Sequence, residues 1–355
     1  MSVTKVSAAL THSQPRNFIL DGDYTQFPES NITAIANSAY GAALWENFDV
    51  GGELVHDVDQ LADVPTVAES GHASTYSMSL DITTAESAVA TGDFQVIEYK
   101  VTGSDFAHLN QQQVTLSFWH KHTKTGTFCG YFMNSAENRS YVYEYTQNTT
   151  NTWEQHTETV TLDTSGTWLL TEADIGLRVG FCMYGGSTFQ GTADSWEGAK
   201  DYCTSSQVAG ADNAANFCKF SQVGLYLGST APTFTSPSIA TVKDQVGYYI
   251  IRHNFDASSA MTIIVGHTGS ATEGICRWHF GRLMRATPTL TSTAADTWKW
   301  RDDDATILTP SSITIDEATL GSSRIVFTGS SFTQGGGRAT RDGTDTCYFQ
   351  ADARH

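Results

Sequence analysis

The sequence has few positive charges, few prolines and no long apolar run. Its 355 residues include 20 Lys and Arg against 38 Asp and Glu, and the formal net charge of -18 is spread along the chain. This shortage of cations argues against binding to a nucleic-acid backbone and against charge-driven adhesion to an anionic membrane. No stretch approaches the roughly 18 apolar residues of a spanning helix, and residues 1–16 lack the apolar core of a signal peptide. We therefore expect no nucleic-acid binding, no membrane insertion and no export by a signal peptide.

Short motifs that mark catalytic and metal-binding sites are also lacking. The chain contains no nucleophile elbow, P-loop or HExxH motif, and its six cysteines include no C-x-x-C pair. His120 and His122 fall on one face of an expected strand, but two ligands alone do not build a structural zinc site. The run Asp302, Asp303 and Asp304 is interpreted as a solvated turn. We therefore predict that the protein is not an enzyme and holds no metal at these positions.

The cysteines fall into different contexts. Cys129 and Cys182 lie in strand patterns, where a buried thiol serves as a small apolar residue. Cys203 and Cys218 flank a loop, and their spacing does not decide whether they form a disulfide.

Alternation of apolar and polar residues is the dominant pattern of the chain and is typical of strands that bury one face. Residues 114–119 and 127–132 have this period and are separated by a polar turn, which predicts a hairpin. The next segment places Tyr141, Tyr143 and Tyr145 on one face. The same pattern recurs at residues 154–162, 175–183 and 217–227. With 30 Gly and a charged fraction of only 16%, these segments predict an all-β jelly-roll sandwich of antiparallel sheets.

A second set of strands follows a segment rich in Pro, Ser and Thr, Ala231 to Ser238, which has the composition of a linker. Between this segment and the C-terminus lie eight short strand candidates separated by Gly, Asp and Ser. We therefore predict a second, smaller β-sandwich domain.

Several of these segments carry recognisable strings of residues. They are NFILDGDYTQF, FQVIEYKVTG, SAENRSYVYEYT, NTWEQHTETV, GLRVGF and FSQVGLYLGS, followed by MRATPTLT and CYFQADARH. These strings resemble a family of bacteriophage virion proteins, namely tail-fibre or minor structural proteins with a carbohydrate-binding-module-like jelly roll and a C-terminal β-domain. The first string resembles the family's first strand, and the resemblance extends from about Asn17 to the end.

The resemblance implies a division into three parts and a set of partners. The parts are an N-terminal attachment arm at residues 1–16, a jelly-roll domain at 17–230 and a C-terminal β-sandwich domain at 239–355. The implied location is the virion, assembled in the host cytoplasm, and the implied partners are other virion proteins, with host surface polysaccharide as an additional candidate. The fibre analogy implies a homotrimer. No cofactor is expected, but a structural calcium ion near Asp23 stays open, because Thr25 replaces an acidic residue that such jelly rolls carry and calcium needs several oxygen ligands.

Two functions follow from the resemblance. In the first, the protein belongs to a tail fibre or another appendage and mediates attachment to host-surface glycans. In the second, it is a decoration protein of the capsid or tail and binds only other virion subunits. The sequence discriminates weakly between them.

Aromatic residues are the candidates for glycan binding, because sugar C–H faces stack on aromatic rings while sugar hydroxyls need amide or carboxylate partners. The candidates are Trp196 and Tyr202 in the long loop of residues 184–216, Tyr143 in a strand, and Trp298 and Trp300 in the second domain. The alternative is that these residues pack in the core, as aromatic residues at period two commonly do.

Overall fold

The computed structural model describes residues 15–255, 264–302, 307–333, 335–341 and 347–355, and it divides into two compact units. The first unit comprises residues up to Thr25 together with 33–39 and 47–236, and the second comprises 26–32, 40–46 and 237–355. Two short early segments thus group with the second unit, whereas the sequence-based division includes them in the domain at 17–230. Of the predicted attachment arm, residues 1–14 lie outside the described part of the chain.

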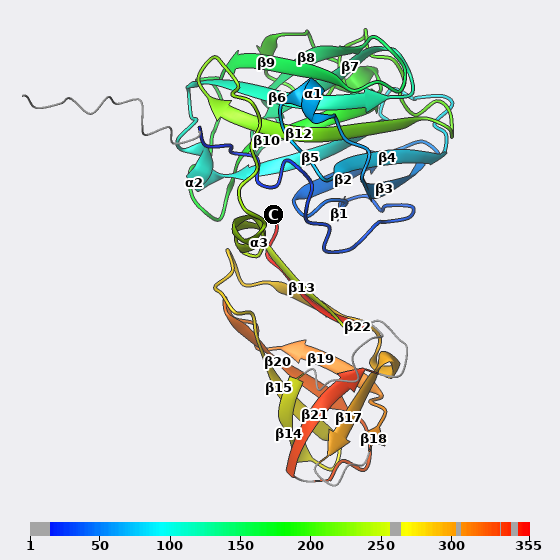
Figure 1. Ribbon diagram of the computed structural model, residues 1–355, viewed down its shortest axis with the longest axis vertical. Coiled ribbons are helices and arrows are strands. Elements are labelled where there is room, and N and C mark those ends of the chain that lie inside the picture. The colour runs from blue at the N-terminus through cyan, green and yellow to red at the C-terminus, as the bar shows by residue number, and fades with distance from the viewer. Residues whose placement is uncertain (1–14, 256–263, 303–306, 334, 342–346) are drawn as a thin grey trace, which may run out of the picture. The chain divides into compact units, whose positions relative to one another are not determined.

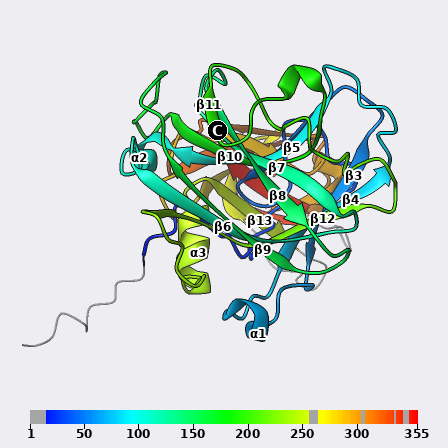
Figure 2. The same ribbon diagram turned by 90° about the horizontal axis from the view of Figure 1, so that it is seen from above.

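Two antiparallel sheets build the first unit, and the predicted all-β sandwich is confirmed (Figure 1). The seven-stranded sheet has the order β1 (Ala39–Tyr40), β2 (Trp45–Val50), β5 (Phe94–Thr102), β10 (Ile175–Gly185), β7 (Gly126–Met133), β8 (Ser140–Gln147) and β11 (Ser195–Glu197). The five-stranded sheet has the order β3 (Val55–Leu61), β4 (Ser77–Thr84), β12 (Phe217–Leu227), β6 (Gln113–His122) and β9 (Glu154–Thr161). Figure 2 shows β5, β7 and β10 in one layer and β6 and β9 in the other.

Aromatic side chains fill the space between these two sheets. Phe181 of β10 stacks on Phe220 of β12 with 4.0 Å between the ring centroids, and it contacts Phe118 of β6 at 4.7 Å. Because Phe181 belongs to one sheet and its two partners to the other, these contacts hold the sheets face to face. Side chains alternate along a strand, so the inward position of Phe118 places Trp119 and Lys121 on the opposite face of β6.

Large rings of the first unit lie directly over glycines of the neighbouring strand. Tyr143 and Gly130 are register partners on β8 and β7, and a Cβ at Gly130 would lie 2.1 Å from the Tyr143 hydroxyl oxygen. Gly180 is covered in the same way, because its Cβ would lie 2.3 Å from Cζ of Tyr131. Only glycine leaves room for these rings, which in turn shield the exposed backbone.

The first strand that the resemblance implies at Asn17 is not formed, and that prediction is wrong. The segment forms turns, in which Asp21 and Tyr24 have left-handed φ angles of 53° and 52° that are incompatible with an extended chain. It nevertheless runs beside β12. The Phe18 N–H donates to the Leu225 carbonyl, and the Leu225 N–H donates to the Asn17 side chain, both at 2.9 Å.

Helices of the first unit are short. They are α1 (Val67–Ser70), α2 (Gly103–Phe106) and a 3₁₀ turn at Ser187–Phe189. A capping box starts α1, because the Thr66 hydroxyl accepts from the Glu69 N–H at 3.3 Å and the Glu69 carboxylate accepts from the Thr66 N–H at 2.7 Å. The helix ends at Gly71, whose left-handed φ of 75° suits glycine. These caps fix the position of Ser70, which lines the pocket described below.

The segment predicted to be an interdomain linker, Ala231 to Ser238, packs on the first unit as far as Ser236. Phe234 is buried, and its ring contacts that of His72 edge to face with 5.1 Å between centroids. The Ser236 hydroxyl donates to Asp23 at 2.6 Å. These contacts leave little of this segment free to act as a linker.

The second unit contains one α-helix in its described residues, α3 (Ile239–Val246), and two antiparallel sheets. The three-stranded sheet has the order β13 (Ile250–Phe255), β22 (Cys347–Asp352) and β16 (Thr289–Ser292). The seven-stranded sheet has the order β18 (Ile307–Leu308), β17 (Trp298–Asp302), β21 (Gly335–Arg341), β14 (Ile264–Ser270), β15 (Glu273–His279), β20 (Ser322–Thr328) and β19 (Ser312–Asp316). A 3₁₀ turn at Ala295–Thr297 precedes β17. No helix in the described part of the chain is long and apolar enough to span a lipid bilayer.

Two tryptophans organise the core of the second unit. Trp298 of the seven-stranded sheet stacks on Phe349 of the three-stranded sheet with 4.2 Å between centroids. Trp300, two residues later on the same face, contacts Phe327 at 5.7 Å and Phe332 at 6.0 Å. Because Trp298 and Phe349 come from different sheets, the aromatic core joins the two sheets as a sandwich.

Strand β21 is not predicted by the sequence, because GGGRATR has the composition of a loop. The structure gives the physical reason for its glycines. A Cβ at Gly337 would lie 2.2 Å from the Trp300 ring, and a Cβ at Gly274 on β15 would lie 2.6 Å from it. The indole of Trp300 therefore lies across glycines of two strands, which must lack side chains there.

Asp302 also differs from its interpretation as part of a solvated turn. Its side chain is buried at the end of β17 and accepts hydrogen bonds from the Trp300 indole N–H and the Thr333 backbone N–H, both at 2.6 Å. That interpretation is wrong for Asp302, because a carboxylate that caps two buried donors is shielded from water. Asp303 and Asp304 lie outside the described residues.

Candidate functional site

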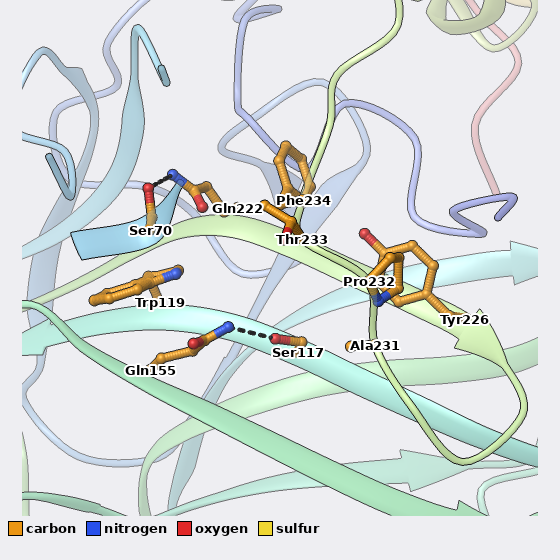
Figure 3. A pocket seen from close by; sticks show the side chains of 10 residues that line it. All are labelled: Ser70, Ser117, Trp119, Gln155, Gln222, Tyr226, Ala231, Pro232, Thr233 and Phe234. Atoms are coloured by element: carbon orange, nitrogen blue, oxygen red, sulfur yellow. Dashed lines mark hydrogen bonds between the residues drawn. The ribbon is translucent and has the colours of Figure 1, made fainter. Parts of the chain in front are cut away.

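A pocket of about 230 Å³ opens on the face of the five-stranded sheet that points away from the sandwich core. Figure 3 shows side chains from β6, β9 and β12 together with those of α1 and the segment after β12. The residues that line it are Ser70, Ser117, Trp119, Gln155, Gln222, Tyr226, Ala231, Pro232, Thr233 and Phe234. It thus combines aromatic rings with amides and hydroxyls.

Trp119 supplies the largest aromatic surface of this pocket. Because Phe118 and His120 point into the sandwich, Trp119 projects to the outer face, where neighbouring segments leave it 8% exposed. None of the residues that the structure describes accepts a hydrogen bond from its indole N–H. In Figure 3 the indole nitrogen lies on the side of the ring that faces the other pocket residues. Trp119 therefore presents both an aromatic ring and an indole N–H donor to the pocket.

Gln222 supplies an acceptor that has no partner in the described part of the chain. It lies in a bulge of β12, where the register with β6 shifts, and its φ of 52° is unusual for a residue other than glycine. Its amide nitrogen donates to the hydroxyls of Ser70 and Ser74 at 2.9 and 2.8 Å, which fixes the orientation of the amide. The amide oxygen is buried and, among the described residues, accepts no hydrogen bond. A buried acceptor of this kind is costly unless a ligand or water supplies the donor.

Gln155 and Tyr226 complete the polar lining. Gln155 lies opposite Trp119 in the β9–β6 register and is exposed, and its amide donates to the Ser117 hydroxyl at 3.1 Å. Burial, assisted by the charge of Asp23, raises the pKa of Tyr226 to about 12. The Tyr226 hydroxyl therefore stays neutral at physiological pH, so it contributes a dipole and no charge.

A charged cluster occupies the next row of the same face. Lys121 and Lys219 are register partners on β6 and β12, and both ammonium groups bind Asp63, at 2.9 and 2.7 Å. The Trp153 indole N–H also donates to Asp63, at 3.2 Å. Burial acts to raise the pKa of Asp63, but the hydrogen bonds from Lys219 and Lys121 outweigh it and hold that pKa below its usual value. The cluster thus keeps two cations on one carboxylate beside the pocket.

Four of the five aromatic residues predicted for glycan binding are buried in cores. Tyr143 lies between the sheets of the first unit, and Tyr202 packs on Phe94 with 4.7 Å between centroids. Trp298 and Trp300 form the core of the second unit. Because none of the four presents a ring face to solvent, the structure does not support them as stacking residues, and their packing roles agree with the alternative interpretation.

Trp196, the fifth candidate, lies on the edge strand β11 and is partly exposed. Its indole N–H donates to the Thr161 carbonyl at 2.9 Å, and its ring contacts Tyr141 at 5.4 Å and Trp168 at 5.6 Å. Since β11 belongs to one sheet and Thr161 to the other, Trp196 closes a seam between the two sheets. It is not among the residues that line the pocket.

Replacing Trp196 with Ala is therefore expected to destabilise the first unit by about 2–3 kcal/mol, because the ring loses its packing and the Thr161 carbonyl loses its donor. Thermal unfolding and urea titration measure this change. Saccharide binding by the folded variant is expected to match that of the wild type. Unchanged stability combined with lost binding would restore Trp196 as a stacking residue.

The residues considered for metal binding have protein partners. Asp23, considered for calcium, accepts from the Ser74 hydroxyl at 2.8 Å and the Ser236 hydroxyl at 2.6 Å, and it is hydrogen-bonded to the His72 ring at 2.8 Å. His120 and His122 point into the core of the sandwich, where His122 stacks on a phenylalanine ring. Over the ranges that the structure describes, no three His, Cys, Asp or Glu side chains are grouped to hold a metal ion.

Sequence reasoning did not select the residues of this pocket, although one signal was present. The alternation that places Phe118 inside also places Trp119 outside, so an aromatic residue on the outer face follows from the pattern itself. The bulge at Gln222 and the packing of residues 231–234 on the sheet have no comparable signal. Both depend on contacts between segments that are distant in the sequence.

Comparisons with known proteins give weak similarities of structure and none of sequence. No family model and no curated protein matches the chain. The enzymatically active domain of tailspike protein 4 from bacteriophage CBA120 is 13% identical with a TM-score of 0.31, over 56% of this chain and 22% of that chain. A putative sugar-binding protein from Bacteroides thetaiotaomicron is 12% identical with a TM-score of 0.33, over 60% and 100%. A family 11 carbohydrate-binding module from Clostridium thermocellum, solved with a mixed-linked tetrasaccharide, is 11% identical with a TM-score of 0.30, over 57% and 99%.

Proposed function

We propose that the first unit binds a saccharide in the pocket beside Trp119, and that the protein is a phage virion component that attaches to glycans of the host surface. The observation that carries the binding proposal is the buried amide oxygen of Gln222, which no described residue binds, in the pocket that the Trp119 indole also lines. The virion role is supported by the resemblance of the strand sequences to phage tail-fibre and minor structural proteins. Binding, without catalysis, is the activity proposed.

The chemistry of the pocket suits a sugar ring. A sugar has an apolar C–H face that packs against the Trp119 indole and hydroxyls that both donate and accept hydrogen bonds. One hydroxyl donates to the Gln222 oxygen, which relieves its cost of burial, and another accepts from the indole N–H. The volume of about 230 Å³ is below the range of about 300–1,000 Å³ typical of drug-sized ligands, which favours a single sugar residue in the pocket.

A pocket of this size gives weak binding at one site, because few atoms contribute to affinity. A virion presents many copies of its structural proteins. Several weak sites that engage one polysaccharide at the same time strengthen attachment without any new contact. Such multivalency is consistent with the homotrimer that the fibre analogy implies.

The test is a glycan array, followed by titration with the strongest ligand it identifies. Gln155 is exposed, so Gln155→Ala leaves the fold intact and is expected to weaken binding by about three- to ten-fold through one lost hydrogen bond. Trp119→Ala is expected to weaken it by at least about ten-fold, as for a central aromatic contact. Trp119→Phe keeps a ring but removes the N–H, and it is expected to show an intermediate loss.

Two controls separate binding from folding. Circular dichroism and thermal unfolding establish that each variant is folded before its affinity is compared. Trp196→Ala removes a tryptophan outside the pocket and is expected to keep wild-type affinity once folded. Equal affinity of wild type and all pocket variants, or no glycan bound by correctly assembled particles, would contradict the proposal and favour a decoration role that involves only virion subunits.

A further inference from the structure

Three thiols of the first unit lie in one buried cluster. Cys129 on β7, Cys182 on β10 and Cys203 in the segment between β11 and β12 belong to the same group of packed apolar residues. All six cysteines are reduced and buried. Buried thiols often act as plain apolar side chains.

Cys182 and Cys203 lie close to each other in this cluster. The Cys182 thiol donates to the Tyr184 carbonyl at 3.2 Å, and the Cys203 thiol lies 3.6 Å from the Gly185 carbonyl that accepts from it. Both sulfurs lie beside Gly185, since a Cβ there would be 2.6 Å from Sγ of Cys203 and 3.7 Å from Sγ of Cys182. Glycine at this position therefore leaves the space in which the two side chains meet.

Cys129 is the register partner of Cys182 on the adjacent strand β7, but Cys129 and Cys218 have other hydrogen-bond partners. The Cys129 sulfur accepts from the Thr204 N–H at 3.4 Å and lies 3.7 Å from the Thr204 hydroxyl. Cys218 lies on β12 of the other sheet, where its sulfur is 3.6 Å from the ring of His122. The sequence raises Cys203 and Cys218 as a pair, but the structure places the Cys203 sulfur near that of Cys182, beside Gly185.

We infer that Cys182 and Cys203 are a site of disulfide formation, closed when the protein passes from a reducing to an oxidising environment. The bond would join β10 to the segment between β11 and β12. The roughly 20 residues enclosed by the bond include β11 and Trp196. Oxidation would therefore pin the edge strand of the seven-stranded sheet. This inference is independent of the proposed saccharide binding.

The reaction needs an oxidant, and a small-molecule disulfide such as oxidised glutathione is a suitable one. The Cys203 thiolate attacks one sulfur of the small disulfide, forms a mixed disulfide and releases one thiol. The Cys182 thiolate then attacks the Cys203 sulfur and releases the second thiol. Two electrons pass from the protein to the small disulfide, and the two protons lost by the cysteines end on the released thiols. Burial raises the pKa of the Cys182 thiol well above its usual value, so the second step is expected to be slow at neutral pH and faster in alkali.

The experiment oxidises the folded full-length protein with oxidised glutathione at pH 8.5, blocks remaining thiols, and maps the linkage by mass spectrometry. Trypsin cuts after Arg178 and Lys200, so Cys182 and Cys203 fall in different peptides. We expect these two peptides to be linked, with the loss of two hydrogen atoms and four thiols still free. The Tm is expected to rise by about 5–10 °C, because the bond closes a loop of about 20 residues.

Cys218 lies in the same tryptic peptide as Cys203, so the mapping is repeated on Cys218→Ser. This variant is expected to keep the link, whereas Cys203→Ser is expected to lose it. The disulfide linkage found in the wild-type protein tests the inference even where a variant fails to fold. A link between Cys129 and Cys182, glutathione retained on Cys203, or six free thiols after prolonged oxidation would each overturn the inference.

Discussion

Replacing Trp300 with Ala is expected to destabilise the second unit by about 3–5 kcal/mol, which is a large part of the stability of an ordinary domain. The side chain is fully buried and lies across Gly337 of β21 and Gly274 of β15, so the substitution leaves a cavity that these two positions have no side chains to fill. It also removes the indole N–H that binds the buried Asp302 carboxylate. The loss of packing and the loss of a donor to the buried carboxylate both lower the stability of the folded unit.

Hydrogen exchange locates this effect. In Trp300→Ala, amides of β14, β15, β17 and β21 are expected to exchange faster, whereas those of the first unit stay unchanged. Trp300→Phe keeps a ring and removes the donor, so its smaller cost of about 1–3 kcal/mol isolates the contribution of the Asp302 hydrogen bond. Val265→Ala, at an exposed position of the same sheet, is the control and is expected to change stability by less than about 0.5 kcal/mol. Wild-type protection in Trp300→Ala would contradict the packing described above.

The first unit is expected to lose stability as the pH falls from about 6.5 to about 4. Burial lowers the pKa of His56 to about 4 and that of His120 to about 4, and it lowers the pKa of His122 well below the usual value. In the unfolded chain these histidines bind protons below about pH 6.5, but the folded state does not accept them. Stability is therefore complete above that pH and is lost as the pH falls toward the folded pKa values.

The size of this loss is about 3 kcal/mol for each of His56 and His120, from a pKa shift of about 2.5. Some carboxyl groups act in the opposite sense. Burial raises the pKa of Asp49 to about 6 and also raises that of Glu98, so their protonation in acid relieves a cost of folding. Asp49 is only partly buried and solvent screens it, so the histidines are expected to dominate.

Urea titrations at pH 7 and pH 4.5 measure this difference. The midpoint for the first unit is expected to fall in acid, and His120→Gln is expected to reduce the fall. His120 contacts Gln147 through a hydrogen bond of 3.0 Å, and an amide at position 120 can still bind that partner without titrating. His108, which is exposed, provides the control variant His108→Gln, for which the wild-type fall is expected. An equal or higher midpoint at pH 4.5 would show that the buried histidines do not control acid stability.

Most strands of the first unit are well predicted from the sequence, because the local alternation of apolar and polar residues determines them. In β6 to β10 and in β12, each residue's position along the strand decides which face it occupies, and the apolar residues follow that alternation. The same local reasoning fails for β21, whose glycines are required by a tryptophan on another strand. It also fails for Asp302, which is buried because Trp300 and Thr333 supply donors from elsewhere in the fold.

The candidate site is less predictable than the fold, because it depends on contacts between segments that are distant in the sequence. Tyr143, Trp298 and Trp300 were plausible glycan ligands because aromatic residues in strands occur both in cores and on binding surfaces, and only the packing of the second sheet distinguishes these cases. Trp119 was accessible to sequence reasoning through alternation with Phe118. The free oxygen of Gln222 was not, since it depends on a bulge in β12 and on two serines near α1.

The most direct test of saccharide binding follows the indole N–H signals of the protein by NMR during titration with the strongest glycan from the array. The signal of Trp119, assigned by its absence in Trp119→Phe, is expected to shift and saturate, because a sugar hydroxyl then accepts from this N–H. The signal of Trp196, whose N–H is already bound to the Thr161 carbonyl, is expected to stay in place. A saturating shift of Trp196 with an unmoved Trp119 signal would contradict the account.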